Sequence, residues 1–310
     1  MTDPKGDPSM EFARPSGIRT FKNGLATVLV TFAALLALVP LVWILWSVIS
    51  QGLPSMFDVQ WWVADQVGVT QNCPSDPPRR GCRTNGGVLH AVVGTVMIGV
   101  ITALIAVPLA VLGAIFLIEY GRGKRLGRAV SFMVDILSGV PSIVAALFIY
   151  AMVITLFGFG RSGIAAALAL VLLMIPTVFR STEEMLKLVP DSLREASYAL
   201  GVPKWKTIVR VVVPTAFGGI ATGVVLGLAR VMGETAPLLI LIGYATNFTM
   251  NPLTQDLGTL PTMINVGMNI PQQMPGYDRI WGAALTLIMV VMLLNLAARG
   301  IERATKLKER

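Results

Sequence analysis

Charged and metal-binding side chains are scarce in this chain. Asp, Glu, Lys and Arg make up 14% of its 310 residues, against about 25% in a typical soluble domain. There is one histidine, His90, and there are two cysteines. Because no group of Cys, His or carboxylate residues surrounds His90 in the sequence, we expect no metal site. The scarcity of charge argues against a soluble domain.

Signatures of catalysis are also lacking. A phosphate-binding loop needs Gly-x-x-x-x-Gly-Lys-Ser/Thr, and the stretch Gly121-Arg-Gly-Lys-Arg125 has the wrong spacing. The sequence contains no His-Glu-x-x-His zinc pattern and no Gly-x-Ser-x-Gly elbow. An intramembrane hydrolase would need a nucleophile with a base or a metal, and neither is found. We therefore expect a non-catalytic chain without a cofactor of its own, and any ATP chemistry must come from another chain.

Long apolar runs dominate what is present, since 54% of the residues are hydrophobic. Several runs reach the ~20 residues that a helix needs to cross a bilayer. The first is too long for the ~7–15-residue core of a signal peptide and predicts a retained helix. The sequence predicts an all-α, polytopic transmembrane bundle of about six spans, at residues 25–49, 88–118, 131–157, 163–180, 215–245 and 281–299.

The basic residues follow the topology of this six-span chain. Lys and Arg concentrate at Lys5–Lys22, Arg122–Arg128, Arg180–Arg210 and Arg299–Arg310, which all fall on one side. The positive-inside rule places that side, with both termini, in the cytoplasm. We therefore interpret the formal charge of +8 as setting the topology of a multi-pass protein in contact with membrane lipid, and we expect no nucleic-acid partner.

Composition divides the chain into segments. Cys73 and Cys82 lie in the first predicted external loop. They either form a disulfide or remain two unpaired thiols, and the sequence leaves both alternatives open. The loop 246–280 is either functional or a plain connection. The predicted segments are a disordered cytoplasmic tail (1–22), the first span with the Cys-bearing loop (23–87), a transmembrane domain (88–299) with a cytoplasmic loop at 181–214, and a cytoplasmic tail (300–310).

Two ionisable residues, Arg230 and Glu234, lie inside the fifth apolar run. Charges at bilayer depth are costly and usually face protein or an aqueous path. Residues four apart occupy one helix face, so we expect the two side chains to be neighbours. A small-xxx-small series on this helix predicts close approach of a second helix. It consists of Gly219, Gly223 and Gly227.

The chemistry of this pair suits an oxyanion. The planar guanidinium of Arg230 presents a fork of donors that matches phosphate or sulfate oxygens. Glu234 would balance that charge and accept a hydrogen bond from a protonated phosphate, whereas sulfate offers no such proton. A buried ion pair that only fixes helix packing is the alternative, and the residues alone leave both open.

Four more polar residues lie in or next to the apolar runs. Arg180, at the end of the fourth run, by itself indicates a snorkelling residue that sets topology. Glu183 follows at helical spacing and can pair with it. Asp135 is explained equally well as a carboxylate at a helix start. Ser138 can donate to an oxyanion or bond back to its own helix.

The loop 181–214 carries a pair of short predicted helices. Pro190 and Asp191 are typical of the start of a helix, and Gly201 is typical of its end. Pro203 is typical of the first turn of the next helix. The result is a compact knob for a partner to bind, or alternatively an amphipathic hairpin lying on the membrane surface.

The knob carries the first family resemblance. Glu195-Ala-Ser-Tyr-Ala-Leu-Gly201 followed by Val211-Val-Val-Pro214 resembles the EAA loop of ABC importer permeases, with Gly and Pro at the family's spacing. Ser197, Val211 and Val213 replace the usual Ala, Ile and Leu. Three other stretches resemble phosphate-specific (Pst-type) permeases: Asp135–Ile143, Arg180–Leu186 and Ala229–Pro237.

This resemblance covers about 88–299 and implies a type I (MetI-like) permease core in a bacterial cell membrane. It implies an inorganic phosphate path with Arg230, Glu234, Arg180, Glu183, Asp135 and Ser138. ATPase coupling would use Glu195, Ala196, Ser197, Leu200, Gly201, Pro203 and Trp205. The implied partners are a related (PstC-like) permease, two (PstB-like) ATPase subunits that bind ATP and Mg, and an external (PstS-like) phosphate-binding protein. Another oxyanion such as sulfate or molybdate, or a sensing subunit without transport, remains the alternative.

Overall fold

The fold is described from a computed structural model, which describes residues 17–66, 86–253, 256–270 and 277–308. The chain divides into two compact units, Met1–Ser47 and Val48–Arg310, and each is described by itself. Cys73 and Cys82 lie outside the described residues.

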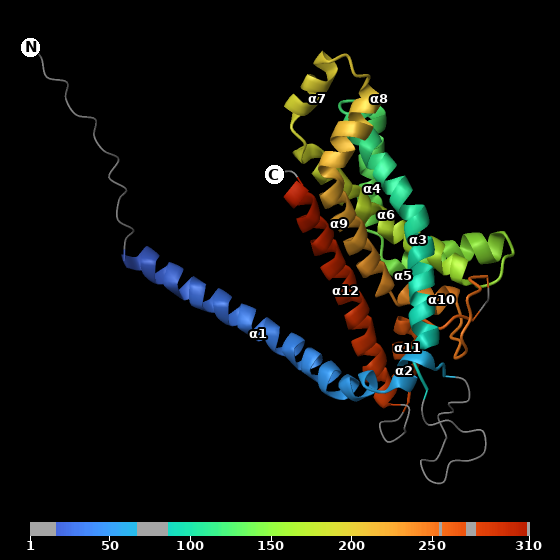
Figure 1. Ribbon diagram of the computed structural model, residues 1–310. Coiled ribbons are helices and arrows are strands. Elements are labelled where there is room, and N and C mark those ends of the chain that lie inside the picture. Colours follow the sequence, from blue (N-terminus) through green and yellow to red (C-terminus); the bar gives the residue numbers. More distant parts are fainter. Residues whose placement is uncertain (1–16, 67–85, 254–255, 271–276, 309–310) are drawn as a thin grey trace, which may run out of the picture. The chain divides into compact units, whose positions relative to one another are not determined.

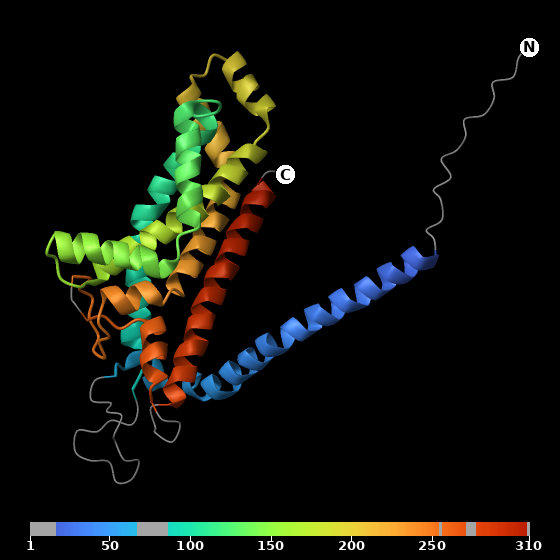
Figure 2. The same ribbon diagram turned by 180° about the vertical axis from the view of Figure 1, so that it is seen from behind.

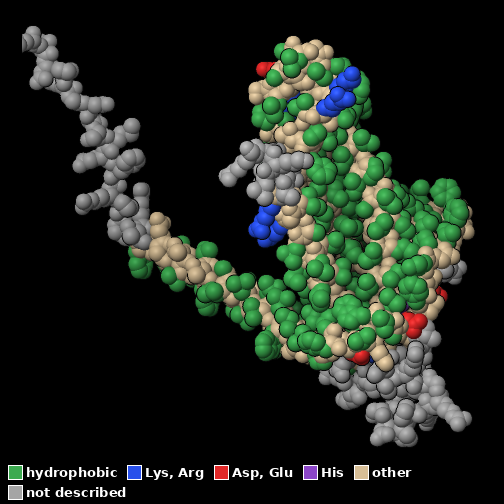
Figure 3. Space-filling model, viewed as in Figure 1, with side chains coloured by type: hydrophobic (Ala, Val, Ile, Leu, Met, Phe, Trp, Pro, Cys, Tyr) green, Lys and Arg blue, Asp and Glu red, His purple; other side chains and the backbone are tan. Residues whose placement is uncertain are grey.

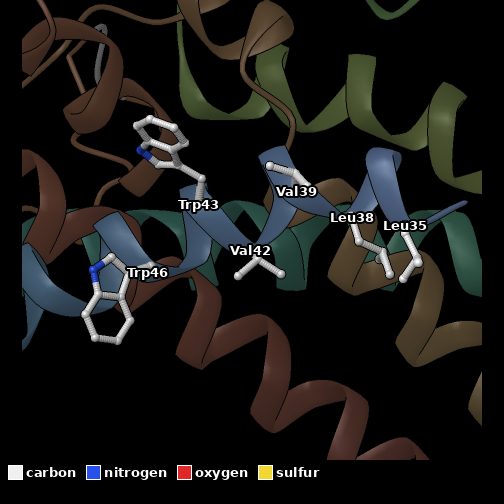
Figure 4. A pocket seen from close by; sticks show the side chains of 6 residues that line it. All are labelled: Leu35, Leu38, Val39, Val42, Trp43 and Trp46. Carbon is white, nitrogen blue, oxygen red and sulfur yellow. The ribbon is translucent and has the colours of Figure 1, made fainter. Parts of the chain in front are cut away.

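The first unit contains most of α1 (Gly17–Met56), which begins within the segment predicted as a tail. From Phe21 onwards it is a candidate membrane span, and its most apolar window has no buried residue. Large side chains border an apolar hollow on this helix (Figure 4). They are Leu35, Leu38, Val39, Val42, Trp43 and Trp46. Such an exposed apolar surface is typical of a helix that faces lipid.

The second unit begins with the last turns of α1 and contains all the other helices of the described chain. In Figures 1 and 2, α7 and α8 lie at one end of this unit and α2 and α11 at the opposite end. The α-helices are α2 (Val59–Val63), α3 (Leu89–Ile115), α4 (Arg125–Ser138), α5 (Ser142–Ile149), α6 (Gly163–Leu188), α7 (Asp191–Ala199), α8 (Lys204–Thr207), α9 (Val213–Met232), α10 (Ala236–Leu241), α11 (Leu260–Gly267) and α12 (Asp278–Lys308). Three π-helical segments join them: η1 (Phe116–Tyr120), η2 (Tyr150–Leu156) and η3 (Ile208–Val212).

The all-α prediction is confirmed for the described residues, where the β-structure is one isolated bridge between Gly243 and Asp256. Five helices are long and apolar enough to cross a membrane, and a bent pair makes a sixth if it counts as one span. The five are Phe21–Met56, Leu89–Tyr120, Gly163–Leu188, Lys204–Met232 and Arg279–Ile301.

The predicted span 131–157 corresponds to a bent pair of helices. It contains a bend of 104° between Arg125–Ser138 and Ser142–Leu156. Pro141 has no N–H for a helical hydrogen bond and disfavours helical geometry at the preceding Val140. Its φ of −61° and ψ of 142° place it as the N-cap of α5. The proline therefore ends one helix and starts the next in a new direction.

The core of the second unit is built around α6, which packs against α3 and α9. Small residues allow this packing. In α9, a Cβ at Gly219 or Gly223 would overlap Met185 or Ser181 of α6. The predicted close approach at the glycine series is therefore confirmed. The face of this unit seen in Figure 3 is largely apolar.

A second close contact joins α3 to the segment before α11. The backbone N–H of Leu260 donates to the hydroxyl of Thr95 at 2.9 Å. One residue earlier in α3, a Cβ at Gly94 would overlap the carbonyl oxygen of Gly258. Because a backbone atom cannot rotate away, this glycine is required for the contact.

We therefore expect Gly94→Ala to destabilise the protein, although alanine is the better helix former by about 1 kcal/mol. Overpacking of this kind costs about 1–3 kcal/mol or more. Gly99→Ala in the same helix is the matched control, since its Cβ would meet the flexible Met232 side chain at 3.2 Å. Thermal unfolding of the purified protein in detergent measures both. Equal unfolding temperatures for the two variants would contradict the contact.

Candidate functional site

Two arginines from different helices line one cavity in the second unit. The cavity has a volume of about 370 Å³ and lies among α4, α6 and α9. Since one water molecule needs about 10–15 Å³ on such a scale, there is room for a small anion with water. The polar side chains on its wall are those of Arg180, Arg230, Glu184, Ser138, Thr177 and Ser181. The cavity thus combines two guanidinium groups with one carboxylate and three hydroxyls.

Arg180 is held by partners on two helices. Its guanidinium forms ion pairs with Asp135 of α4 and with Glu183 of its own helix. It also donates to the carbonyl and hydroxyl oxygens of Ser131, each at 3.2 Å. Glu183 is buried and also accepts from Lys187 at 2.7 Å. The sequence placed Asp135 and Glu183 on the anion path; the structure brings both together around Arg180.

Arg230 is positioned differently. It lies in the last turn of α9, its side chain is exposed in this chain, and it lines the cavity. Among the ion pairs of the described residues, none involves Arg230. Its donors therefore remain available to a ligand in the cavity.

The predicted pairing of Arg230 with Glu234 on one helix face is wrong. The helix ends at Met232, with Gly233 as its C-cap, and Glu234 follows outside it. Pro237 stands at the start of α10 and has no N–H to continue the helical ladder. Glycine followed by this proline breaks the fifth apolar run, so helical spacing does not apply across the break.

Ser138 borders the cavity, but its hydroxyl donates to the carbonyl oxygen of Asp135 at 2.7 Å. Of the two interpretations open from the sequence, the bond back to its own helix is the one formed here. The oxygen of that hydroxyl can still accept a hydrogen bond in the cavity.

The predicted knob is present as two short helices. Pro190 is the N-cap of α7 and Pro203 the N-cap of α8, and Gly201 adopts a φ of +75° between them. Ser197 is buried, and its hydroxyl lies 2.8 Å from that of Thr207. The helix starts and the glycine stop are therefore confirmed at the predicted residues.

Most predicted coupling residues of the knob face outward. Leu200 is 83% exposed and Trp205 is 59% exposed. A groove of about 630 Å³ lies between the two helices. Its wall includes Ala196, Ser197, Leu200, Gly201 and Pro203. Glu195 is exposed as well, so of the seven predicted residues only Ser197 is buried.

Sequence reasoning missed several polar residues. Glu184 was not among the predicted path residues, yet it supplies the carboxylate of the cavity. Glu119 and Arg194 form a buried ion pair at 3.0 Å, which no pattern predicted. The available signals were an acidic residue directly after the second apolar run and a basic residue directly before Glu195.

Comparison with known proteins places this arrangement in a family. The family of binding-protein-dependent transport system inner membrane components matches residues 106–306. The chain belongs to this family. The permease is therefore an integral membrane protein, and the matched region contains the cavity and the knob.

The relatives of the permease include proteins named for phosphate transport. Phosphate transport system permease protein PstA 1 of Mycobacterium tuberculosis (strain ATCC 25618 / H37Rv) is 48% identical over 283 residues, which are 91% of this chain and 88% of that protein. The PstA protein of Yersinia pestis is 38% identical over 284 residues, 91% of this chain and 90% of that protein. The resemblance to Pst-type permeases is thereby confirmed.

Solved structures agree on the fold. An inward-facing MetNI methionine ABC transporter chain superposes with a TM-score of 0.58 at 20% identity, covering 70% of this permease and 95% of that chain. A bacterial alginate ABC transporter chain gives a TM-score of 0.63 at 14% identity, covering 93% and 97%. At these identities the likeness concerns the fold alone, and it confirms the predicted MetI-like core.

Proposed function

We propose that this permease is the transmembrane subunit of an ATP-driven importer of inorganic phosphate. The observation that carries the proposal is the pair of guanidinium groups on one cavity, Arg180 and Arg230. A doubly charged anion at bilayer depth needs compensating positive charge, and guanidinium forks match its oxygens. Relatives named as phosphate transport permeases support phosphate as that anion.

In the proposed mechanism the two arginines differ in role. Arg230, which has no ion pair among the described residues, contacts the anion directly. Arg180 is partly neutralised by Asp135 and Glu183, so it offers a weaker and more adjustable attraction. A site of this kind binds the anion strongly enough to admit it and weakly enough to release it. Glu234 lies beyond the end of α9 and remains a proposed path residue, without the expected pairing to Arg230.

Glu184 favours phosphate over sulfate. Its carboxylate lines the same cavity as the two guanidinium groups. Near neutral pH phosphate carries a proton that a carboxylate can accept as a hydrogen bond, whereas sulfate carries none. A carboxylate in the cavity therefore repels sulfate without a compensating bond.

The proposed importer needs partner subunits for ATP hydrolysis, for anion delivery and for the rest of the path. A related permease covers the open side of the cavity, and two ATPase subunits bind ATP and Mg and dock on the knob at 191–212. An external phosphate-binding protein delivers the anion on the opposite side. The positive-inside rule, applied to the basic segments, supports a cytoplasmic side for the knob and both termini. This permease itself contributes no catalytic residue.

Reconstitution tests the proposal. In vesicles that contain both permeases and the ATPase, with the binding protein outside, we expect phosphate uptake only when ATP is hydrolysed. Excess sulfate or molybdate should leave that uptake nearly unchanged. Strong competition by either anion would favour another oxyanion, and phosphate-dependent signalling without uptake would favour a sensing subunit.

A further inference from the structure

Both helices of the knob are attached to one residue of the membrane-spanning core. That residue is Glu119, in the π-helical segment η1 that follows α3. Its carboxylate accepts two hydrogen bonds from Arg194 of α7, at 3.0 and 3.1 Å. Its backbone carbonyl accepts a bond from Lys204, the first residue of α8. The two arms of the knob therefore meet at Glu119.

Arg194 is fully engaged at this junction. Besides Glu119, its guanidinium donates to the carbonyl oxygens of Leu186 at 3.0 Å and Val189 at 2.7 Å, at the end of α6. A fifth bond, of 3.0 Å, goes to Asp191 in its own helix. Four of these five donor bonds fix α7 against η1 and the end of α6. This contact is rigid because each donor has a partner.

The pair is also shielded from water. The Glu119 side chain is 4% exposed and that of Arg194 is 10% exposed. Screening by salt and water is weak for such a pair, so its attraction persists over small movements of the knob. Lys204 adds a contact from its ammonium to the ring of Tyr120, 4.7 Å from the centroid.

The backbone at this point is suited to movement. In η1 the N–H of Gly121 bonds to the carbonyl of Phe116, five residues back, at 2.8 Å. A second π-helical segment, η3, joins α8 to α9. Such segments are rare and commonly occur at functional positions. The knob thus contacts η1 at the end of α3 and continues through η3 into α9, and both segments have the i→i+5 bonding of a π-helix.

We propose that Glu119 is a positioning residue for energy coupling, which transmits movement of the docked knob to α3. The inference rests on the proposed importer function. Since α3 and α9 both pack on α6, displacement of Glu119 changes the walls on which Arg180 and Arg230 stand. No part of the proposal requires Glu119 to contact the anion or ATP.

The test is Glu119→Gln in the complete complex. The amide keeps the size of the side chain but removes the charge that holds Arg194. We expect the ATPase to remain bound, while its stimulation by the phosphate-loaded binding protein and the phosphate imported per ATP hydrolysed both fall at least about fivefold, within the usual range of coupling effects. Glu119→Asp restores the charge and should recover part of both readouts.

Arg122→Gln is the matched control, because it removes one charge from an exposed residue three positions away. It should behave like the unsubstituted complex. Normal stimulation and normal uptake per ATP in Glu119→Gln would overturn the proposal. Loss of the assembled complex in that variant would overturn it as well, since the pair would then serve only folding.

The experiment separates this inference from the proposed function. A complex of unsubstituted chains that hydrolyses ATP on stimulation but imports no phosphate would refute the phosphate proposal. The stimulation readout would still test Glu119, because it does not depend on which anion crosses.

Discussion

Arg230→Ala is expected to reduce phosphate uptake at least about a hundredfold while the complex stays assembled. A hydrogen bond to a charged group contributes about 1.5–3 kcal/mol, and a guanidinium fork forms two of them with an oxyanion. Arg230 has no ion pair among the described residues, so its removal breaks no internal bond of that kind. Uptake by reconstituted vesicles and co-purification of the subunits measure the two parts of this prediction.

Two further variants sharpen this test. Arg230→Lys keeps the charge without the planar fork, so uptake should return in part. Arg161→Ala removes a charge from an exposed arginine that stacks on Tyr150 and does not line the cavity, and it should transport normally. Unchanged uptake in Arg230→Ala would exclude Arg230 from the anion path. Equal losses in Arg230→Ala and Arg161→Ala would point to an effect of net charge.

The two arginines differ in their partners, so substitution of Arg230 gives the clearer test of the anion path. Arg180 is partly exposed and already shares its charge with two carboxylates and with Ser131. Replacing it would leave buried Glu183 with Lys187 alone. A defect in that variant would therefore combine lost attraction for the anion with disturbed helix packing. Arg230 separates these effects because it has no ion-pair partner among the described residues.

Much of this fold could be predicted from local sequence. Apolar runs of sufficient length predicted the spanning helices, and proline and glycine predicted the knob to within a residue at Pro190 and Gly201. These features depend on hydrophobicity and backbone geometry, which neighbouring residues determine. The family resemblance of the chain was then confirmed by the comparisons.

The errors arose where a continuous apolar run contains a break. Gly139–Pro141 lies inside the third predicted span and Gly233–Pro237 inside the fifth. Hydropathy does not end either span there, because neither stretch is polar enough. The structure bends by 104° at the first and ends α9 at the second. Glu234 was therefore assigned to the wrong face, although Pro237 already gave the signal.

Pairs that join distant segments could not be predicted at all. Asp135 and Arg180 are 45 residues apart, and Glu119 and Arg194 are 75 apart. Asp135 was explained locally as a helix-start carboxylate, which is wrong because it lies in the last turn of α4, and Arg180 was explained as a topology-setting arginine. Their pairing depends on how α4, α6 and η1 pack, which no local pattern contains.

Gly201→Val is expected to weaken docking of the ATPase by about five- to thirtyfold. Gly201 has a φ of +75°, and an added Cβ would meet no atom within 4 Å. The effect is therefore one of backbone conformation: the left-handed region costs a β-branched residue about 1–2 kcal/mol, and each 1.4 kcal/mol is a factor of ten. The turn would relax and move α7 relative to α8, which closes or distorts the groove between them. Binding of the purified ATPase subunit to the permease pair measures the change.

The chain offers controls that isolate this backbone effect. Gly201→Asn should bind the ATPase nearly as well as glycine does, because asparagine tolerates the left-handed region. Gly158→Val introduces the same strain at a φ of +72°, also in open space, but in the turn after η2. If the knob is the docking element, only the substitution at Gly201 weakens ATPase binding. Equal binding by Gly201→Val and Gly158→Val would show that the shape of this turn does not control docking, and the knob would then revert to a hairpin on the membrane surface.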